Sequence, residues 1–198
     1  MLKRKEVFYN IKMFTYTTIP NFLSKEECSN IINASLTNLK LTPAQIGSGD
    51  NLGLNENYRK SNVAFTQYTK SFPLLKDRIV NALSDIIKVK GYDLSFDSNF
   101  QFTEYQTDGH YDWHTDSDDI FSHRYCSLVI QLNDEYTGGE LKVIDNKEEI
   151  TLEKGIGNLF IFLSSLEHKV EKVTKGTRYS LVNWFSLKPI DGFKKTLI

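Results

Sequence analysis

The stretch EYQTDGHYDWHTDSDD, residues 104–119, combines two histidines, six acidic residues, three aromatic residues and a glycine. Its segment YDWHTD has the aromatic and β-branched character of a β-strand. Residues two apart point to the same face of a strand. His114 and Asp116 are therefore predicted to present an imidazole and a carboxylate to a common point.

The third residue of this group is expected much later in the chain. His168 lies in SSLEHKVEKV, after the apolar run GNLFIFL at residues 157–163. Two histidines and one carboxylate form the facial triad that holds Fe(II) in non-haem oxygenases and leaves positions open for substrate and O₂. We therefore predict a metal site formed by His114, Asp116 and His168.

An arginine follows ten residues after His168. Arg178 opens the apolar run RYSLVNWFSL, in which Arg178, Ser180, Val182 and Trp184 share one face by the two-residue period of a strand. A buried charge without a partner is costly, so an inward-facing arginine requires an anion. A carboxylate cosubstrate held by both arms of the guanidinium would satisfy it.

The opening stretch also contains residues that are typical of two other kinds of metal site. On an uninterrupted strand His110 would share the face of His114, and an H-x₃-H pair on a helix could bind zinc. Gly109 argues against regular structure there and no H-E-x-x-H glutamate is present, so His110 is expected beside the site or facing solvent. A calcium loop of the EF-hand type is excluded, because neither register of Asp112 or Asp116 places a glycine at position six.

The segments around these residues predict a mainly β fold. From about residue 96 short apolar runs alternate with Gly, Asn and Asp, which is typical of a β-barrel or jelly roll. Two helices are expected before it: one starting at a capping box of Ser24 and Glu27, and one opened by Pro73 and capped by Gly91. The chain is thus divided into a supporting region, residues 1–95, and a β core, residues 96–190, within one α+β domain.

Residues 41–60 contain three glycines and several asparagines, which predicts a long loop. Loops of this length in compact domains are usually functional or mobile. We expect this one to act as a mobile clamp over bound substrate.

Composition limits the partners. The chain has 198 residues, 24 basic and 25 acidic, with a net charge of -1, which does not suggest a nucleic-acid or membrane partner. The first twenty residues lack the apolar run of a signal peptide, and no stretch is long enough for a membrane span. Cys28 and Cys126 do not form a disulfide framework and are expected to be reduced core residues. A cytoplasmic location is the expectation.

Several motifs together resemble a known family. YQTDGHYDWHTD resembles the Y-x₅-Y-x₂-H-x-D signature of prolyl 4-hydroxylase-like 2-oxoglutarate/Fe(II) dioxygenases, and EYTGGEL resembles their glycine pair before a strand. GNLFIFLSSLEHKVEKVTKGTRYSLVNWF is similar to the histidine-to-arginine module of their bacterial and phage branch, and LSKEECSNII and RKSNVAF resemble their N-terminal region. The resemblance covers about residues 18–188.

This resemblance implies a double-stranded β-helix, the cupin-like jelly roll, flanked by N-terminal helices. It implies iron ligation by His114, Asp116 and His168, and pairing of Arg178 with the far carboxylate of 2-oxoglutarate. The remaining implied contacts are Tyr105 and Gln131 with 2-oxoglutarate, and Tyr111 and Trp184 with the substrate pocket. Gln131 departs from the family, because many relatives have tyrosine there.

The implied reaction is hydroxylation of a C–H bond with release of succinate and CO₂, with Fe(II) and 2-oxoglutarate as cofactors and ascorbate as a reductant. The expected substrate is a prolyl residue of a peptide or protein. Alternatives are the same chemistry on a free amino acid, another small molecule or a nucleobase, and a cupin-like metal-binding module without oxygenase activity. The near-neutral charge argues against nucleic acid, and Arg178 argues against a plain metal module.

Overall fold

Two antiparallel sheets dominate the computed structural model, which describes residues 15–47, 52–67, 72–87, 92–96, 99–117, 121 and 123–190. Within these ranges the larger sheet runs in the order β1 (Tyr16–Ile19), β12 (Leu159–Leu163), β8 (Cys126–Gln131), β15 (Arg178–Pro189), β6 (Phe100–Tyr105), β4 (Asn62–Thr66) and β2 (Thr42–Pro43), with β5 (Tyr92–Phe96) pairing to β15. The smaller sheet runs β11 (Glu148–Thr151), β10 (Leu141–Asp145), β13 (His168–Val170), β7 (His110–His114) and β3 (Arg59–Lys60). A short ladder joins β14 (Val173–Lys175) to β9 (Thr137–Gly138). This arrangement is the expected double-stranded β-helix.

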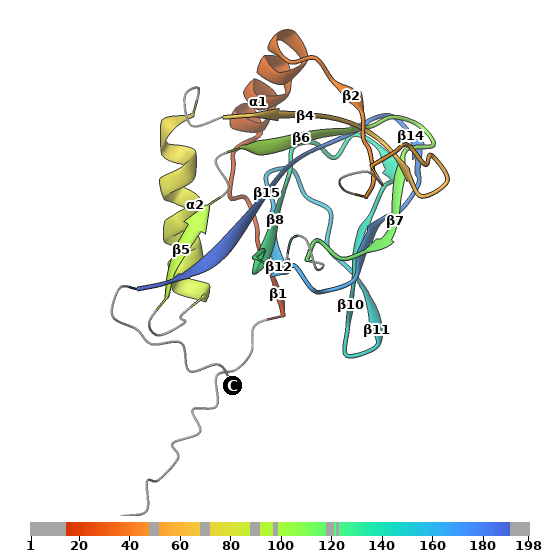
Figure 1. Cartoon of the computed structure of the whole chain (residues 1–198). Coiled ribbons are helices and arrows are strands. Elements are labelled where there is room, and N and C mark those ends of the chain that lie inside the picture. The colour runs from red at the N-terminus through yellow and green to blue at the C-terminus, as the bar shows by residue number, and fades with distance from the viewer. Residues whose placement is uncertain are drawn as a thin grey trace, which may run out of the picture.

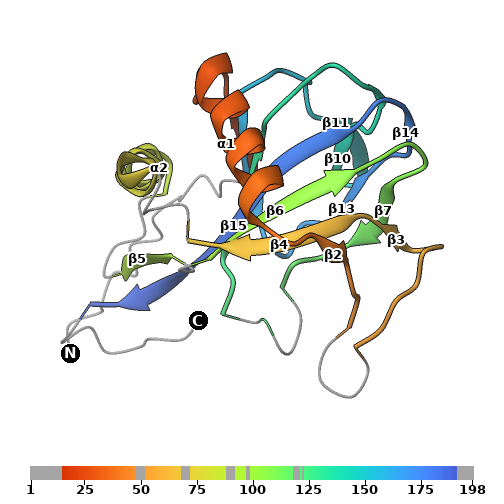
Figure 2. The ribbon, with the colours of Figure 1, turned by 90° about the horizontal axis from the view of Figure 1, so that it is seen from above.

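Helices α1 (Lys25–Asn38) and α2 (Pro73–Ile86) cover the outer face of the larger sheet, on the side away from β7 and β10 (Figures 1 and 2). The predicted capping box of α1 is confirmed, because the Glu27 amide donates to Ser24 Oγ and the Ser24 amide donates to Glu27 Oε2. Helix α2 begins at Pro73 as predicted and ends at Ile86, with Ile87 as its C-cap. Gly91, the residue expected to cap it, lies outside the described residues.

The strands of the larger sheet separate two apolar layers. On β8, Cys126, Leu128 and Ile130 pack against the helices, whereas Val129 belongs to the layer between the sheets. The inner layer is completed by side chains from both sheets: Tyr105, Tyr136, Leu141, Val143, Leu152, Phe160, Phe162, Val170 and Val173. Both cysteines are buried and free, as expected. The alternation follows from the two-residue period of a strand, and it leaves the inner face of β8 and β15 available to a site.

The N-terminal region supplies strands to both sheets. Strand β1 pairs with β12, β4 pairs with β6, and β3 pairs with β7. The prediction of an unbroken loop over residues 41–60 was therefore wrong at both ends, which form β2 and β3, and Ile46 and Gly53 also form a bridge. Residues 48–51 lie outside the described residues. Among the described residues no helix is both long and apolar enough to cross a membrane.

Candidate metal and cosubstrate site

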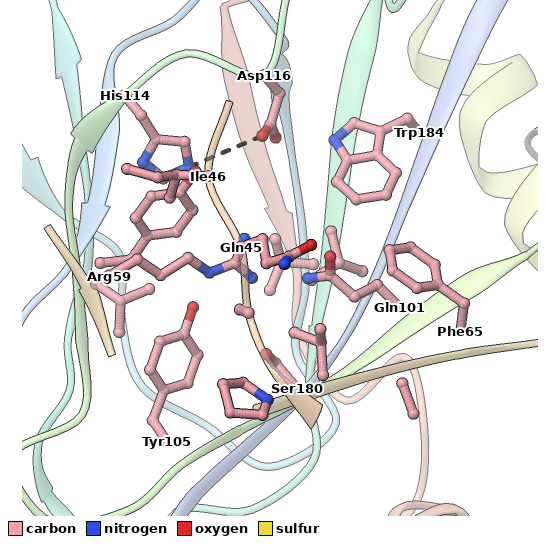
Figure 3. A pocket seen from close by; sticks show the side chains of 18 of the residues that line it. Gln45, Ile46, Arg59, Phe65, Gln101, Tyr105, His114, Asp116, Ser180 and Trp184 are labelled. Atoms are coloured by element: carbon pink, nitrogen blue, oxygen red, sulfur yellow. Dashed lines mark ion pairs between the residues drawn. The ribbon is translucent and has the colours of Figure 1, made fainter. Parts of the chain in front are cut away.

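His114, Asp116 and His168 converge between the two sheets. His114 ends β7, Asp116 follows it by two residues, and His168 begins β13 directly opposite His114 in the ladder. Their ligand atoms all lie within 4.8 Å of one another. The Asp116 carboxylate lies 3.8 Å from Nε2 of His114 and 3.4 Å from Nε2 of His168, and Figure 3 shows the first of these pairs. Cross-strand pairing of β7 and β13 thus brings together residues that are 54 positions apart in the sequence.

Backbone carbonyls fix the orientation of both imidazoles. Nδ1 of His114 lies 2.8 Å from the carbonyl oxygen of Asp112, and Nδ1 of His168 lies 2.9 Å from that of Leu166. A carbonyl oxygen only accepts hydrogen bonds, so Nδ1 carries the proton in each ring. Nε2 of each ring therefore faces Asp116, and this is the nitrogen left to bind a metal ion.

The protonation states also suit a metal ion. Burial, reinforced by repulsion from His168, lowers the pKa of His114 to about 3, so its imidazole is neutral near pH 7. Burial disfavours the charged form of Asp116, but His168, His114 and a hydrogen bond from Ser127 outweigh it and hold its pKa well below its usual range. Two imidazoles and one carboxylate, with no other histidine, cysteine, aspartate or glutamate in the group among the described residues, fit Fe(II) and leave positions open.

A cavity of about 660 Å³ opens beside these three residues. It lies between the sheets and extends along β15, where Arg178, Ser180, Val182 and Trp184 all line it, as the two-residue period predicted. Six residues of strand span about 20 Å, so Arg178 and Trp184 lie far apart along the cavity wall.

Arg178 is buried in this cavity with 1% of its surface exposed. Nη1 donates to Ser180 Oγ at 3.1 Å, whereas Nε and Nη2 are buried and have no hydrogen-bond partner within the described part of the chain. The guanidinium also has no ion-pair partner among those residues. A guanidinium cannot lose its proton, so this position is suited to an anionic ligand with two oxygen atoms.

The 2OG-Fe(II) oxygenase superfamily model matches residues 100–186, which contain all of these residues. Over this part of its sequence the chain is similar to that superfamily. Its relatives include PKHD-type hydroxylases, and similar solved structures include prolyl hydroxylases. It is 27% identical over 195 residues to a PKHD-type hydroxylase of Aliarcobacter butzleri (strain RM4018), covering 91% of this chain and 82% of the relative.

A PKHD-type hydroxylase of Janthinobacterium sp. (strain Marseille) is 30% identical over 106 residues, 49% of this chain and 47% of the relative. The chain spans about half the length of several of the curated relatives it matches. Among solved structures, a Pseudomonas putida prolyl-4-hydroxylase is similar with a TM-score of 0.64 and 21% identity, over 89% of this chain and 95% of that one.

A second solved structure shares the fold more closely. It is a prolyl hydroxylase from Trichoplax adhaerens in complex with a hypoxia inducible factor peptide fragment, with a TM-score of 0.74 and 17% identity. The alignment covers 89% of this chain and 85% of that chain. At these identities the two structures support the jelly-roll fold of the chain.

The tyrosines expected at the site lie along the cavity wall. Tyr105 is buried on β6, is paired with Arg178 in the sheet, and has its ring 5.3 Å from the Arg178 guanidinium carbon. Tyr111 lies on β7, and its ring stacks on the imidazole of His114 with centroids 3.5 Å apart and planes at 17°. Both line the cavity. Burial raises the pKa of Tyr111, so its phenol stays protonated.

Trp184 and Gln131 occupy different positions relative to the cavity. Trp184 lines it, and its buried Nε1 has no hydrogen-bond partner in the described part of the chain. Gln131 is buried at the end of β8, with Nε2 also lacking a partner among the described residues, but its side chain is not part of the cavity wall. Its contact with 2-oxoglutarate stays a prediction.

His110 begins β7, directly after Gly109, so regular structure starts there, contrary to the expectation for this position. Its Nδ1 lies 3.0 Å from the Asp108 carbonyl oxygen and its Nε2 lies 3.2 Å from that of Asn57. His110 is therefore not one of the residues that converge on the metal position.

Sequence reasoning missed Ser127 and Arg59. Ser127 Oγ donates to Asp116 Oδ2 at 2.6 Å, and its place on the inner face of β8 follows from the same period that placed Arg178. Arg59 lines the cavity from β3, within a segment expected to be a loop. RKSNVAF, which begins at Arg59, resembles the family's N-terminal region but did not indicate that Arg59 faces the site.

Proposed function

We propose that this chain is a 2-oxoglutarate- and Fe(II)-dependent dioxygenase that hydroxylates a prolyl residue of a peptide or protein. The observation that carries the proposal is the convergence of His114, Asp116 and His168 in one cavity with a buried arginine that lacks an anionic partner. The match to the 2OG-Fe(II) oxygenase superfamily model supports the chemistry. The prolyl hydroxylases among the similar structures, one of them with a peptide, support the substrate class.

Each residue has a defined task in this proposal. When bound, Fe(II) and 2-oxoglutarate supply the oxidising power for C–H hydroxylation, with release of succinate and CO₂. His114, Asp116 and His168 would hold the iron through Nε2, a carboxylate oxygen and Nε2. Arg178 would bind the far carboxylate of 2-oxoglutarate with its free Nε and Nη2, beside Tyr105.

The cavity walls would shield the reaction from water. Phe162 packs against His168 with ring centroids 4.6 Å apart, and Val129 and Val182 line the cavity beside it. Such apolar walls strengthen the charge interactions of the metal ligands and limit side reactions. Tyr111 and Trp184 would contact the prime substrate, because they line the cavity near His114 and at its end away from Arg178.

The proposal is tested by a paired assay on the full chain. The protein is loaded anaerobically with Fe(II) and 2-oxoglutarate, and succinate is then measured after O₂ and ascorbate are added. Proline-rich peptides are examined by mass spectrometry for the gain of one oxygen atom. We expect both products from the wild type, and neither from His114→Ala or His168→Ala.

His110→Ala is the matched control, because it removes a nearby imidazole that does not face the metal position. It should retain both products. Succinate formation that survives His114→Ala and His168→Ala would refute the assignment of the metal ligands.

A further inference from the structure

The cavity wall is strongly cationic apart from the metal ligands. Among the described residues, the lysines and arginines that line it are Lys40, Arg59, Arg124 and Arg178, whereas the sole acidic residue is Asp116. The charges of Fe(II) and Arg178 would be balanced by those of Asp116 and a dicarboxylate cosubstrate. The positive charge of Arg59 would then remain without an anionic counterpart in the described wall.

Arg59 makes two side-chain contacts in this wall. Nε donates to Ser61 Oγ at 3.0 Å, and the guanidinium carbon lies 4.4 Å from the centroid of the Tyr111 ring. His114 stacks at 3.5 Å on the same ring. Both groups cannot occupy one face at these distances, so Tyr111 is sandwiched between His114 and Arg59.

The two terminal nitrogens of Arg59 have neither a hydrogen-bond partner nor an ion-pair partner within the described part of the chain. Figure 3 shows the side chain reaching into the cavity between His114 and Tyr105. A guanidinium fixed through Nε, with its terminal nitrogens free, is preorganised for a carboxylate. Because one ring separates it from His114, that carboxylate would lie close to the metal position.

We propose that the prime substrate carries a carboxylate near the hydroxylated carbon, and that Arg59 binds this carboxylate. The inference rests on the proposed function and narrows its substrate class. The same chemistry is offered by an acidic side chain next to a target proline and by the α-carboxylate of a free amino acid. Arg59 would select against neutral substrates, because they leave the terminal nitrogens of its guanidinium without a carboxylate partner.

The test uses the full chain loaded anaerobically with Fe(II) and 2-oxoglutarate. Dissociation constants are measured for two proline peptides that differ by Glu or Gln beside the proline, and for free proline and its amide. A charge-assisted hydrogen-bond pair should make at least one acidic compound bind about tenfold or more tightly than its neutral counterpart. A preference confined to the peptides indicates an acidic peptide, and one confined to free proline indicates an amino acid.

Arg59→Gln should bring the ratio of the two affinities close to one, and Arg59→Lys should give an intermediate ratio. Lys60→Gln is the matched control, because it removes one positive charge from the neighbouring, exposed residue of β3, outside the cavity wall. It should keep the wild-type ratio. The preference should also weaken as salt is raised.

Any of three results would overturn the inference. They are equal wild-type affinities for each acidic compound and its neutral counterpart, absence of binding by every acidic compound, and a preference for the acidic compound that survives Arg59→Gln. A loss of 2-oxoglutarate affinity in Arg59→Gln as large as the loss for the acidic compound would also overturn it, because Arg59 would then belong to the cosubstrate site. Succinate released without any prime substrate is recorded separately. Its presence supports the proposed function, whatever the fate of the inference about Arg59.

Discussion

Ser127 Oγ donates a 2.6 Å hydrogen bond to Oδ2 of Asp116, the carboxylate proposed to bind iron. The same hydroxyl lies 3.0 Å from Ser164 Oγ, and the backbone amide of Asp116 donates to the Ser164 carbonyl oxygen at 2.8 Å. Asp116 lies beyond the end of β7, so β-ladder pairing does not fix its position. Its carboxylate is oriented by these contacts with β8 and with the turn after β12.

Ser127→Ala should therefore weaken metal binding while leaving the three ligands present. Loss of a hydrogen bond to a ligating carboxylate typically reduces metal affinity by about 10- to 100-fold. The measurement is an anaerobic titration of Fe(II), or of Mn(II) as a stable substitute. Ser29→Ala removes a hydroxyl from the exposed surface of α1 and should bind metal like the wild type. Wild-type metal affinity in Ser127→Ala would show that the carboxylate is oriented by its backbone alone.

Arg178→Leu should weaken 2-oxoglutarate binding, by about 2–5 kcal/mol if the ion pair is desolvated. Arg178→Lys should be intermediate, because it keeps the charge but loses the planar fork. Metal affinity should change little, since Arg178 is not among the converging ligands. Titration of 2-oxoglutarate into the metal-loaded variants measures both effects.

The same substitution has a second consequence for the protein without cosubstrate. Removing a buried charge that lacks a partner is often neutral or stabilising, so Arg178→Leu should not lower the free energy of unfolding. Lys175→Leu, at an exposed position of β14, is the control for loss of a positive charge. Unchanged 2-oxoglutarate affinity in Arg178→Leu would mean that the arginine is structural and that the cosubstrate lies elsewhere.

The parts of the site that follow the two-residue period of a strand could be predicted from the sequence. His114 and Asp116 stand two apart at a strand end, and Arg178 shares the inward face of β15 with Trp184. The two-residue spacing determines which face of the strand each side chain points to. Burial of the charged Arg178 limits its ligands to anions. The fold followed for the same reason, because closely spaced short strands with turn residues between them have few stable arrangements.

The contacts that Arg59 and Ser127 make in the site could not be predicted in this way. Ser127 acts only because the turn after β7 brings Asp116 beside β8, a tertiary contact that no local pattern encodes. Arg59 lies in a segment rich in Gly and Asn, where pairing of β3 with β7 overrides the local preference for a loop. The strand propensity of such a segment depends on its partner strand more than on its own residues.

The segment from residue 42 to residue 47 is predicted to close over bound substrate. Its residues Thr42, Pro43, Ala44, Gln45, Ile46 and Gly47 all line the cavity. Its backbone is tied at Ala44, which donates to Ser61, and through the bridge between Ile46 and Gly53. Hydrogen exchange should show increased protection here when a substrate peptide binds. Full protection in the free protein would argue against a closing motion.

Gly157 should be required for joining the N-terminal segment to the β core. It has a φ of +77°, and a β-carbon built on it would overlap the carbonyl oxygen of Leu23. The Leu23 amide donates to the Gly157 carbonyl oxygen at 3.1 Å, and the Gly157 amide donates to that of Gln131 at 2.7 Å. Left-handed backbone costs an L-residue about 1–2 kcal/mol, and displacement of Leu23 adds to it, so Gly157→Ala should lower the free energy of unfolding by more than about 2 kcal/mol.

Gly53→Ala is the matched control, because its added β-carbon would meet no atom within 4 Å. Denaturant unfolding of both variants measures the difference, and equal stability of the two would show that the Leu23 turn shifts without cost.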